Sequence, residues 1–161
     1  MAALALSPAL LIGVASADDL PELKARGVLR VIAQKDEAPE LFNLREGEPG
    51  FEREVIDGFA KLHGLTIEPV VMPTAADRIP ALNASRGDLI IGIVAMKSRP
   101  GLEAGLLLGA PGRSAFAIRK SDAQLLAALD EYLGNFRKSP SWNRLLVKYF
   151  GDQALAVLGR R

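Results

Sequence analysis

The sequence contains no cysteine, which excludes a disulfide framework, a thiolate metal site and a cysteine nucleophile. It has a single histidine, His63, which argues against a zinc centre or a Ser-His-Asp triad. An excess of either charge is also missing, because 20 Lys and Arg face 19 Asp and Glu. A net charge of +1 leaves no basic surplus to bind nucleic-acid phosphates. These absences predict a chain with no metal, no cofactor and no nucleic-acid partner, and they argue against an enzyme.

The residues that are present fit one folded domain. Of 161 residues, 49% are hydrophobic and 24% are charged, which is too apolar and too balanced in charge for a disordered chain. Six Phe, two Tyr and one Trp are enough for a modest core, and the length corresponds to a single domain.

The first segment differs from the rest. Residues 2–17, AALALSPALLIGVASA, carry no charge and end in a small-x-small pattern that is typical of a signal-peptidase site. Spanning a membrane takes about 20 apolar residues, and Pro8 would weaken a helix here. The segment predicts a secretory leader, with a retained anchor to a membrane or partner as the alternative. Both place residues 18–161, the folded domain, outside the cytoplasm.

Strand-like and helix-like patterns alternate along residues 18–161. Apolar runs predict strands at residues 28–34, 65–71, 88–94 and 114–120. Amphipathic stretches between and after them predict helices, two of which begin at apparent capping boxes, Thr74–Asp77 and Ser121–Gln124. Successive βαβ crossovers give parallel strands, so the fold class is a three-layer α/β domain.

The order of these pieces resembles one family. The matching stretches are LPELKARGVLRVIAQ, EPGFEREVIDGFAKLHGLTIEPV and IPALNASRGDLIIGIV, followed by SAFAIRKSDAQLLAALDEYLGNFRKSPSWNRLLVKYFG. They are similar to the first lobe of bacterial extracellular solute-binding proteins of family 3, the amino-acid-binding partners of ABC importers. The resemblance implies a four-stranded sheet of order 2-1-3-4, with strand 114–120 antiparallel beside 88–94. Where the family inserts a second lobe, this chain has only a short connector, residues 101–113.

The resemblance also implies where a ligand would bind. The family carries an aromatic residue after the first strand and a Thr-rich turn with an arginine after the third. Here Phe42 is the available aromatic residue, and the turn contains Lys97, Ser98 and Arg99 without the threonine. Arg99 is either a displaced equivalent of the arginine that grips a ligand carboxylate or an exposed loop residue.

Two functions follow from these departures. An apolar surface formed by Leu106, Leu107 and Leu108, together with Leu10, Leu11 and Ile12 of the first segment, predicts contacts with other protein subunits or with a membrane. We therefore expect first a non-enzymatic accessory subunit, docked on an extracytoplasmic membrane complex for transport, respiration or photosynthesis. The alternative is a minimal periplasmic solute-binding protein for an amino-acid-like ligand of an ABC importer. Since a lone lobe covers one face of a small ligand, whereas good sites bury roughly 70–90% of it, we expect no tight binding of a free amino acid.

Overall fold

The computed structural model describes residues 19–94, 102–104, 114–152 and 154. Three α-helices and three strands lie within residues 19–94, with a short 3-10 turn before the third helix. The elements in chain order are α1 (Leu20–Arg26), β1 (Val28–Gln34), α2 (Phe51–Leu62), β2 (Thr66–Met72), η1 (Ala75–Asp77), α3 (Arg78–Asn83), β3 (Leu89–Val94), β4 (Leu102–Ala104), β5 (Ser114–Arg119), α4 (Ala123–Phe136) and α5 (Pro140–Phe150).

The strands form one sheet of order β2-β1-β3-β5-β4. β1 runs parallel to β2 and β3, whereas β5 is antiparallel to β3. The predicted order 2-1-3-4 with an antiparallel last strand is therefore confirmed for the four main strands. The structure adds β4, a three-residue strand antiparallel to β5, within the segment that the sequence predicted as a connector.

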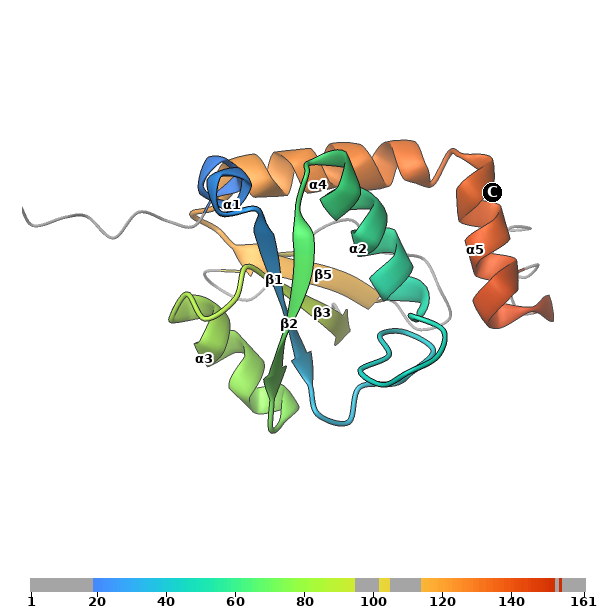
Figure 1. Cartoon of the computed structure of the whole chain (residues 1–161), viewed down its shortest axis with the longest axis horizontal. Helices are drawn as coiled ribbons and strands as arrows, with labels where there is room; N and C mark the ends of the chain where they lie inside the picture. Colours follow the sequence, from blue (N-terminus) through green and yellow to red (C-terminus); the bar gives the residue numbers. More distant parts are fainter. Residues whose placement is uncertain (1–18, 95–101, 105–113, 153, 155–161) are drawn as a thin grey trace, which may run out of the picture.

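Helices cover both faces of this sheet (Figure 1). The larger core lies on the face covered by α1, α2, α4 and α5 and is built from Phe, Leu, Ile and Val side chains of those helices and of β1, β3 and β5. The smaller core lies on the other face, where Ala81 and Leu82 of α3 pack on Ile32, Ile90 and Ala117. The sheet is thus the middle of three layers, as the α/β pattern predicted.

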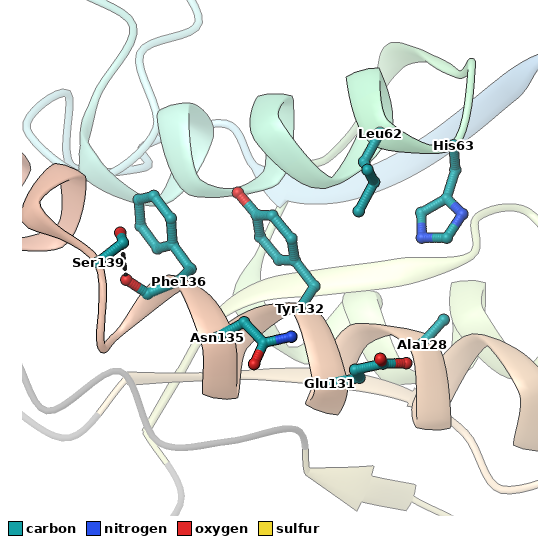
Figure 2. A pocket seen from close by; sticks show the side chains of 8 residues that line it. All are labelled: Leu62, His63, Ala128, Glu131, Tyr132, Asn135, Phe136 and Ser139. Atoms are coloured by element: carbon teal, nitrogen blue, oxygen red, sulfur yellow. Dashed lines mark hydrogen bonds between the residues drawn. The ribbon is translucent and has the colours of Figure 1, made fainter.

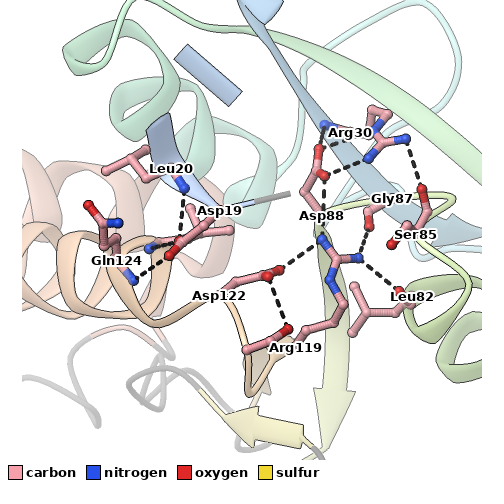
Figure 3. Close-up of polar contacts among 12 residues, drawn as sticks. Asp19, Leu20, Arg30, Leu82, Ser85, Gly87, Asp88, Arg119, Asp122 and Gln124 are labelled. Carbon is pink, nitrogen blue, oxygen red and sulfur yellow. Dashed lines mark hydrogen bonds and ion pairs between the residues drawn. The ribbon is translucent and has the colours of Figure 1, made fainter. Parts of the chain in front are cut away.

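A buried carboxylate joins the ends of three strands at the amino end of β3 (Figure 3). Asp88 is 0% exposed and accepts hydrogen bonds from the Arg26 and Arg30 side chains, each at 2.8 Å. It also accepts the backbone N–H of Arg30 at 2.8 Å. The Arg119 guanidinium at the end of β5 lies 3.7 Å from the same carboxylate. An ionised carboxylate is tolerated in a core only with such partners, so these contacts fix how β1, β3 and β5 meet.

The amino end of α4 corrects one sequence interpretation. The pattern Ser121–Gln124 predicted a local capping box, but the structure shows no side-chain cap from Asp122. Instead the Asp19 carboxylate accepts the backbone N–H groups of Gln124 at 3.1 Å and Leu125 at 2.8 Å, and it also accepts the N–H of Leu20 (Figure 3). One carboxylate thus caps two helices that are about a hundred residues apart in the chain. The other predicted box, Thr74–Asp77, is present as expected.

The contact between α2 and α4 depends on a hydroxyl group and a glycine. Tyr132 Oη donates to the Val55 carbonyl oxygen at 3.0 Å, and its ring packs edge-on against Phe59. The hydroxyl passes so close to Gly58 that a Cβ atom there would lie 2.2 Å from it. Gly134 in α4 has no atom within 4 Å of such a position.

We expect Asp88→Asn to destabilise the fold strongly, because it leaves the buried Arg119 and the partly buried Arg30 facing a neutral amide. Breaking a buried ion pair from one side costs about 3–5 kcal/mol. Asp57→Asn is the matched control, since its pair with Arg53 on α2 is half-exposed and contributes about 0.3–0.5 kcal/mol. Urea unfolding followed by circular dichroism measures both, and equal losses for the two variants would contradict this role of Asp88.

We expect the two helical glycines to respond oppositely to alanine. Gly134→Ala should raise the free energy of unfolding by up to about 1 kcal/mol, the usual helix-propensity gain. Gly58→Ala should lower it, because the new methyl group displaces the Tyr132 hydroxyl from the Val55 carbonyl. In a Tyr132→Phe background the obstructing oxygen is gone, so Gly58→Ala should cost less there. A double-mutant cycle by urea unfolding tests this, and strictly additive effects would contradict it.

Candidate functional site

The sheet has one point where neighbouring parallel strands separate. β1 and β3 pair only at Val31↔Leu89 and Ile32↔Ile90, while β1 continues to Gln34 in full register with β2. β1 leads through α2 on one face, and β3 is reached through α3 on the other. In open α/β sheets, ligands bind outside the carboxyl ends of the strands at such a switch point. The candidate site is therefore the carboxyl end of β1 and β3.

Arg78 reaches this place from the first turn of α3. Its side chain is 12% exposed. Nη1 donates to the Ile91 carbonyl oxygen of β3 at 2.8 Å, and Nε donates to the Ala75 carbonyl oxygen at 3.3 Å. Ile91 lies where the pairing of β3 with β5 shifts register, between Ile90 and Ile93. The guanidinium is thus held by backbone oxygens at the point where the ladder of β3 is irregular.

Glu37 approaches the same place from the loop after β1. Its side chain is 6% exposed, and Oε2 lies 3.9 Å from Arg78 Nη1. The backbone N–H of Gln34 donates to Oε2 at 3.2 Å. Burial raises the pKa of Glu37, while the bond from Gln34 and the charge of Arg78 oppose that rise. The result is a nearly buried pair of a carboxylate and a guanidinium at the carboxyl end of β1 and β3.

The rest of this loop is fixed by its own backbone. Phe51 N–H donates to the Glu40 carbonyl oxygen at 2.8 Å, and Asn43 N–H donates to that of Pro49 at 2.8 Å. Gly50 has φ +99°, and a Cβ there would lie 2.6 Å from the backbone of Leu41, so this close approach requires glycine. These contacts hold the loop in one conformation beside the switch point.

The structure describes one of the four ligand-binding residues that the sequence proposed. Phe42 is fully buried in the larger core, and the Arg53 guanidinium lies 5.2 Å from its ring centroid. Its ring therefore packs inward in this structure, toward α2. Lys97, Ser98 and Arg99 lie outside the described residues, as do the predicted partner-contact residues of the first segment and of the connector, namely Leu10, Leu11, Ile12, Leu106, Leu107 and Leu108.

Sequence reasoning missed both Glu37 and Arg78. Their positions along the sequence could have identified them. Glu37 follows the first predicted strand by three residues, and Arg78 directly follows the Thr74–Asp77 capping box. Charged residues directly after the strands of a parallel sheet gather at its carboxyl edge. The ion pair itself joins residues 41 positions apart, so only the fold brings the two side chains together.

A hollow lies on the helical layer, away from the strand ends. It is an open groove of about 380 Å³ between the end of α2 and α4, and Figure 2 shows the residues that line it: Leu62, His63, Ala128, Glu131, Tyr132, Asn135, Phe136 and Ser139. Its polar groups do not converge. Burial raises the pKa of Tyr132 to about 12, and Asp57 adds to the rise. Burial also lowers the pKa of His63, and the charge of Lys24 adds to this effect while that of Glu131 opposes it.

Two further properties bear on function. Within the described residues, His, Asp and Glu side chains do not form a group of three or more that could hold a metal ion. None of the helices in the described part of the chain combines the length and the hydrophobicity needed to cross a membrane.

Comparison with known structures supports a one-lobe fold. Domain 1 of the protein TmArgBP, in a variant of its arginine-bound form, is 25% identical, with a TM-score of 0.66 over 74% of this chain and 99% of that one. A periplasmic His/Glu/Gln/Arg/opine family-binding protein from Silicibacter pomeroyi, in complex with lysine, is 16% identical, with a TM-score of 0.68 over 78% and 98% of the two chains. An ancestral amino acid-binding protein, described as a precursor of cyclohexadienyl dehydratase, is 19% identical, with a TM-score of 0.64 over 81% and 98%.

The curated proteins contain no match to this sequence. Residues 29–152, however, match the family described as bacterial extracellular solute-binding proteins, family 3. This range begins one residue inside β1, runs past the end of α5 and contains both Glu37 and Arg78. The match to a single domain of TmArgBP shows that the described fold corresponds to one lobe. The chain belongs to the bacterial extracellular solute-binding proteins of family 3.

Proposed function

We propose that this chain is an extracytoplasmic solute-binding lobe that holds an amino acid at the carboxyl end of β1 and β3 and performs no chemical step on it. The observation that carries the proposal is the Glu37–Arg78 pair at the switch point. A zwitterion carries one group of each charge. This edge of the sheet presents the Glu37 carboxylate and the Arg78 guanidinium, both in nearly buried positions. Such desolvated charges bind a complementary ligand more strongly than exposed ones do.

Family membership supports this function over the docking subunit that the sequence favoured. A single domain of TmArgBP was crystallised in an arginine-bound form, so in that protein one lobe holds the ligand. The lack of a second lobe therefore does not by itself argue that this chain has lost ligand binding. Contacts of Leu106, Leu107 and Leu108 with other subunits stay a prediction, and so does the membrane contact of residues 2–17.

The same geometry supports binding without catalysis. Arg78 is fixed by two backbone carbonyl oxygens, and an arginine does not deprotonate near neutral pH. Glu37 therefore has no proton-transfer partner beside it among the described residues. The pair is suited to hold charge, which is what a receptor for a charged solute requires.

We expect the purified chain to bind at least one free amino acid with a Kd in the micromolar to millimolar range. Affinity should stay below that of a site that closes around its ligand, because about 70–90% burial is typical of good small-molecule sites. Isothermal titration calorimetry against arginine, lysine, glutamine, glutamate and leucine is the test. A thermal-shift series provides the check, since a ligand at 100 times its Kd stabilises by about 2.7 kcal/mol.

Arg99→Ala separates the proposed site from nonspecific binding. If Arg99 contacts the ligand carboxylate, as the family resemblance implies, this variant should lose most of the affinity. Arg144→Ala, on the exposed side of α5, serves as the control and should bind as the unmodified chain does. Absence of binding to the whole panel would refute the solute-binding function and return the docking subunit to first place.

A further inference from the structure

The Glu37 carboxylate has one oxygen in use and one available. Oε2 accepts the Gln34 N–H and faces Arg78. Oε1 receives no hydrogen bond from any residue that the structure describes. The side chain is only 6% exposed, so water has little access to it. An acceptor without a protein donor is completed by a donor from water or from a ligand.

The donor that suits this oxygen carries positive charge. Hydrogen bonds between a cationic N–H group and a carboxylate are about twice as strong as neutral ones. Arg78 already partly balances Glu37, but at 3.9 Å its Nη1 is beyond hydrogen-bond distance, and it donates instead to the Ile91 carbonyl oxygen. The internal pair is therefore loose, and it leaves part of the negative charge of Glu37 for a ligand.

We propose that Glu37 is a specificity-determining residue of this site and binds a cationic N–H group of the amino acid through Oε1, with Arg78 as the positioning residue that orients its carboxylate. This rests on the proposed function, since it assigns a role within the same site. Nothing else in the described loop can take this role equally well, because its remaining carboxylates, Asp36, Glu40, Glu46 and Glu48, are more exposed. The cationic group is either the α-ammonium of any amino acid or the basic side chain of arginine or lysine.

Protonation of Glu37 gives the proposal a second readout. Arg78 is the charged group within ion-pair distance of Glu37 among the described residues. A cationic ligand needs the ionised carboxylate, and burial moves the pKa of Glu37 upward from its ordinary value. Affinity is therefore present above that pKa and is lost as the pH falls through it. The loss should begin at a higher pH than an exposed glutamate would show.

The experiment is calorimetry of the full chain with arginine, lysine, glutamine and leucine, comparing the unmodified chain with Glu37→Gln. Removing a charge-assisted hydrogen bond should weaken binding about 10- to 100-fold. A loss confined to arginine and lysine assigns the contact to the basic side chain, and an equal loss for all four assigns it to the α-ammonium. Both results support the proposal. Glu46→Gln, an exposed carboxyl in the same loop, is the matched control and should leave the affinities unchanged.

Two more variants separate binding from folding. Glu37→Asp keeps the charge but withdraws the carboxylate, so it should give an intermediate loss. Arg78→Gln should move the pH at which affinity is lost upward, and Arg78→Lys should restore part of that shift, which a purely structural role would not do. Thermal unfolding confirms that each variant is folded. If the unmodified chain binds ligand and Glu37→Gln binds every ligand equally well at all pH values, the role of Glu37 is overturned while the proposed function stands. If the unmodified chain binds none, the proposed function itself fails.

Discussion

The buried carboxylate of Asp88 is the constraint on which the rest of this lobe depends. Guanidinium groups from α1, β1 and β5 converge on it, and the N–H of Arg30 donates to it at 2.8 Å. Gly87, the residue before Asp88, packs so closely against β1 that a Cβ atom there would lie 2.4 Å from the Ile32 side chain. Arg119 also donates to the carbonyl oxygens of Leu82 and Gly87, which ties the turn before β3 to β5. This polar cluster locks one end of the sheet, and the opposite end is where β1 and β3 separate.

Much of this fold could be predicted from the sequence, because the relevant signals are local. Apolar runs of strand length, the Thr74–Asp77 capping box and Pro69, which the structure places on the edge strand β2, are all read within a few residues. The charged contacts could not be predicted in the same way. Asp88 reads as the polar start of an apolar strand, yet its partners lie on three other elements. Asp19 looks like the residue after a leader, and the structure shows it capping α4 from 105 positions away. Side chains that act across such distances are identified only once the layers are packed.

In the candidate site, too, the local sequence does not reveal contacts between residues that are distant in the chain. Phe42 was proposed because the family has an aromatic residue near that position, and such a comparison does not say which way a ring points. In the structure Phe42 packs under Arg53 in the larger core. Glu37 and Arg78 escaped notice because neither belongs to a motif, and each has an ordinary local explanation. Their significance comes from the topology, which brings the end of β1 and the start of α3 to one switch point.

The loop that carries Glu37 is also tied to the last helix, which gives the site a rigid support. Tyr149 Oη accepts the N–H of Gly50 at 3.1 Å and donates to Glu54 at 2.7 Å, while Lys148 pairs with both Glu48 and Glu54. Burial would raise the pKa of Glu54, but the bonds from Lys148 and Tyr149 outweigh it and lower the pKa. Groups that are oriented before a ligand arrives lower the cost of binding it. The contacts from α5 hold the far end of the loop at Glu48 and Gly50, while Glu37 at its near end is oriented by the Gln34 N–H and by Arg78.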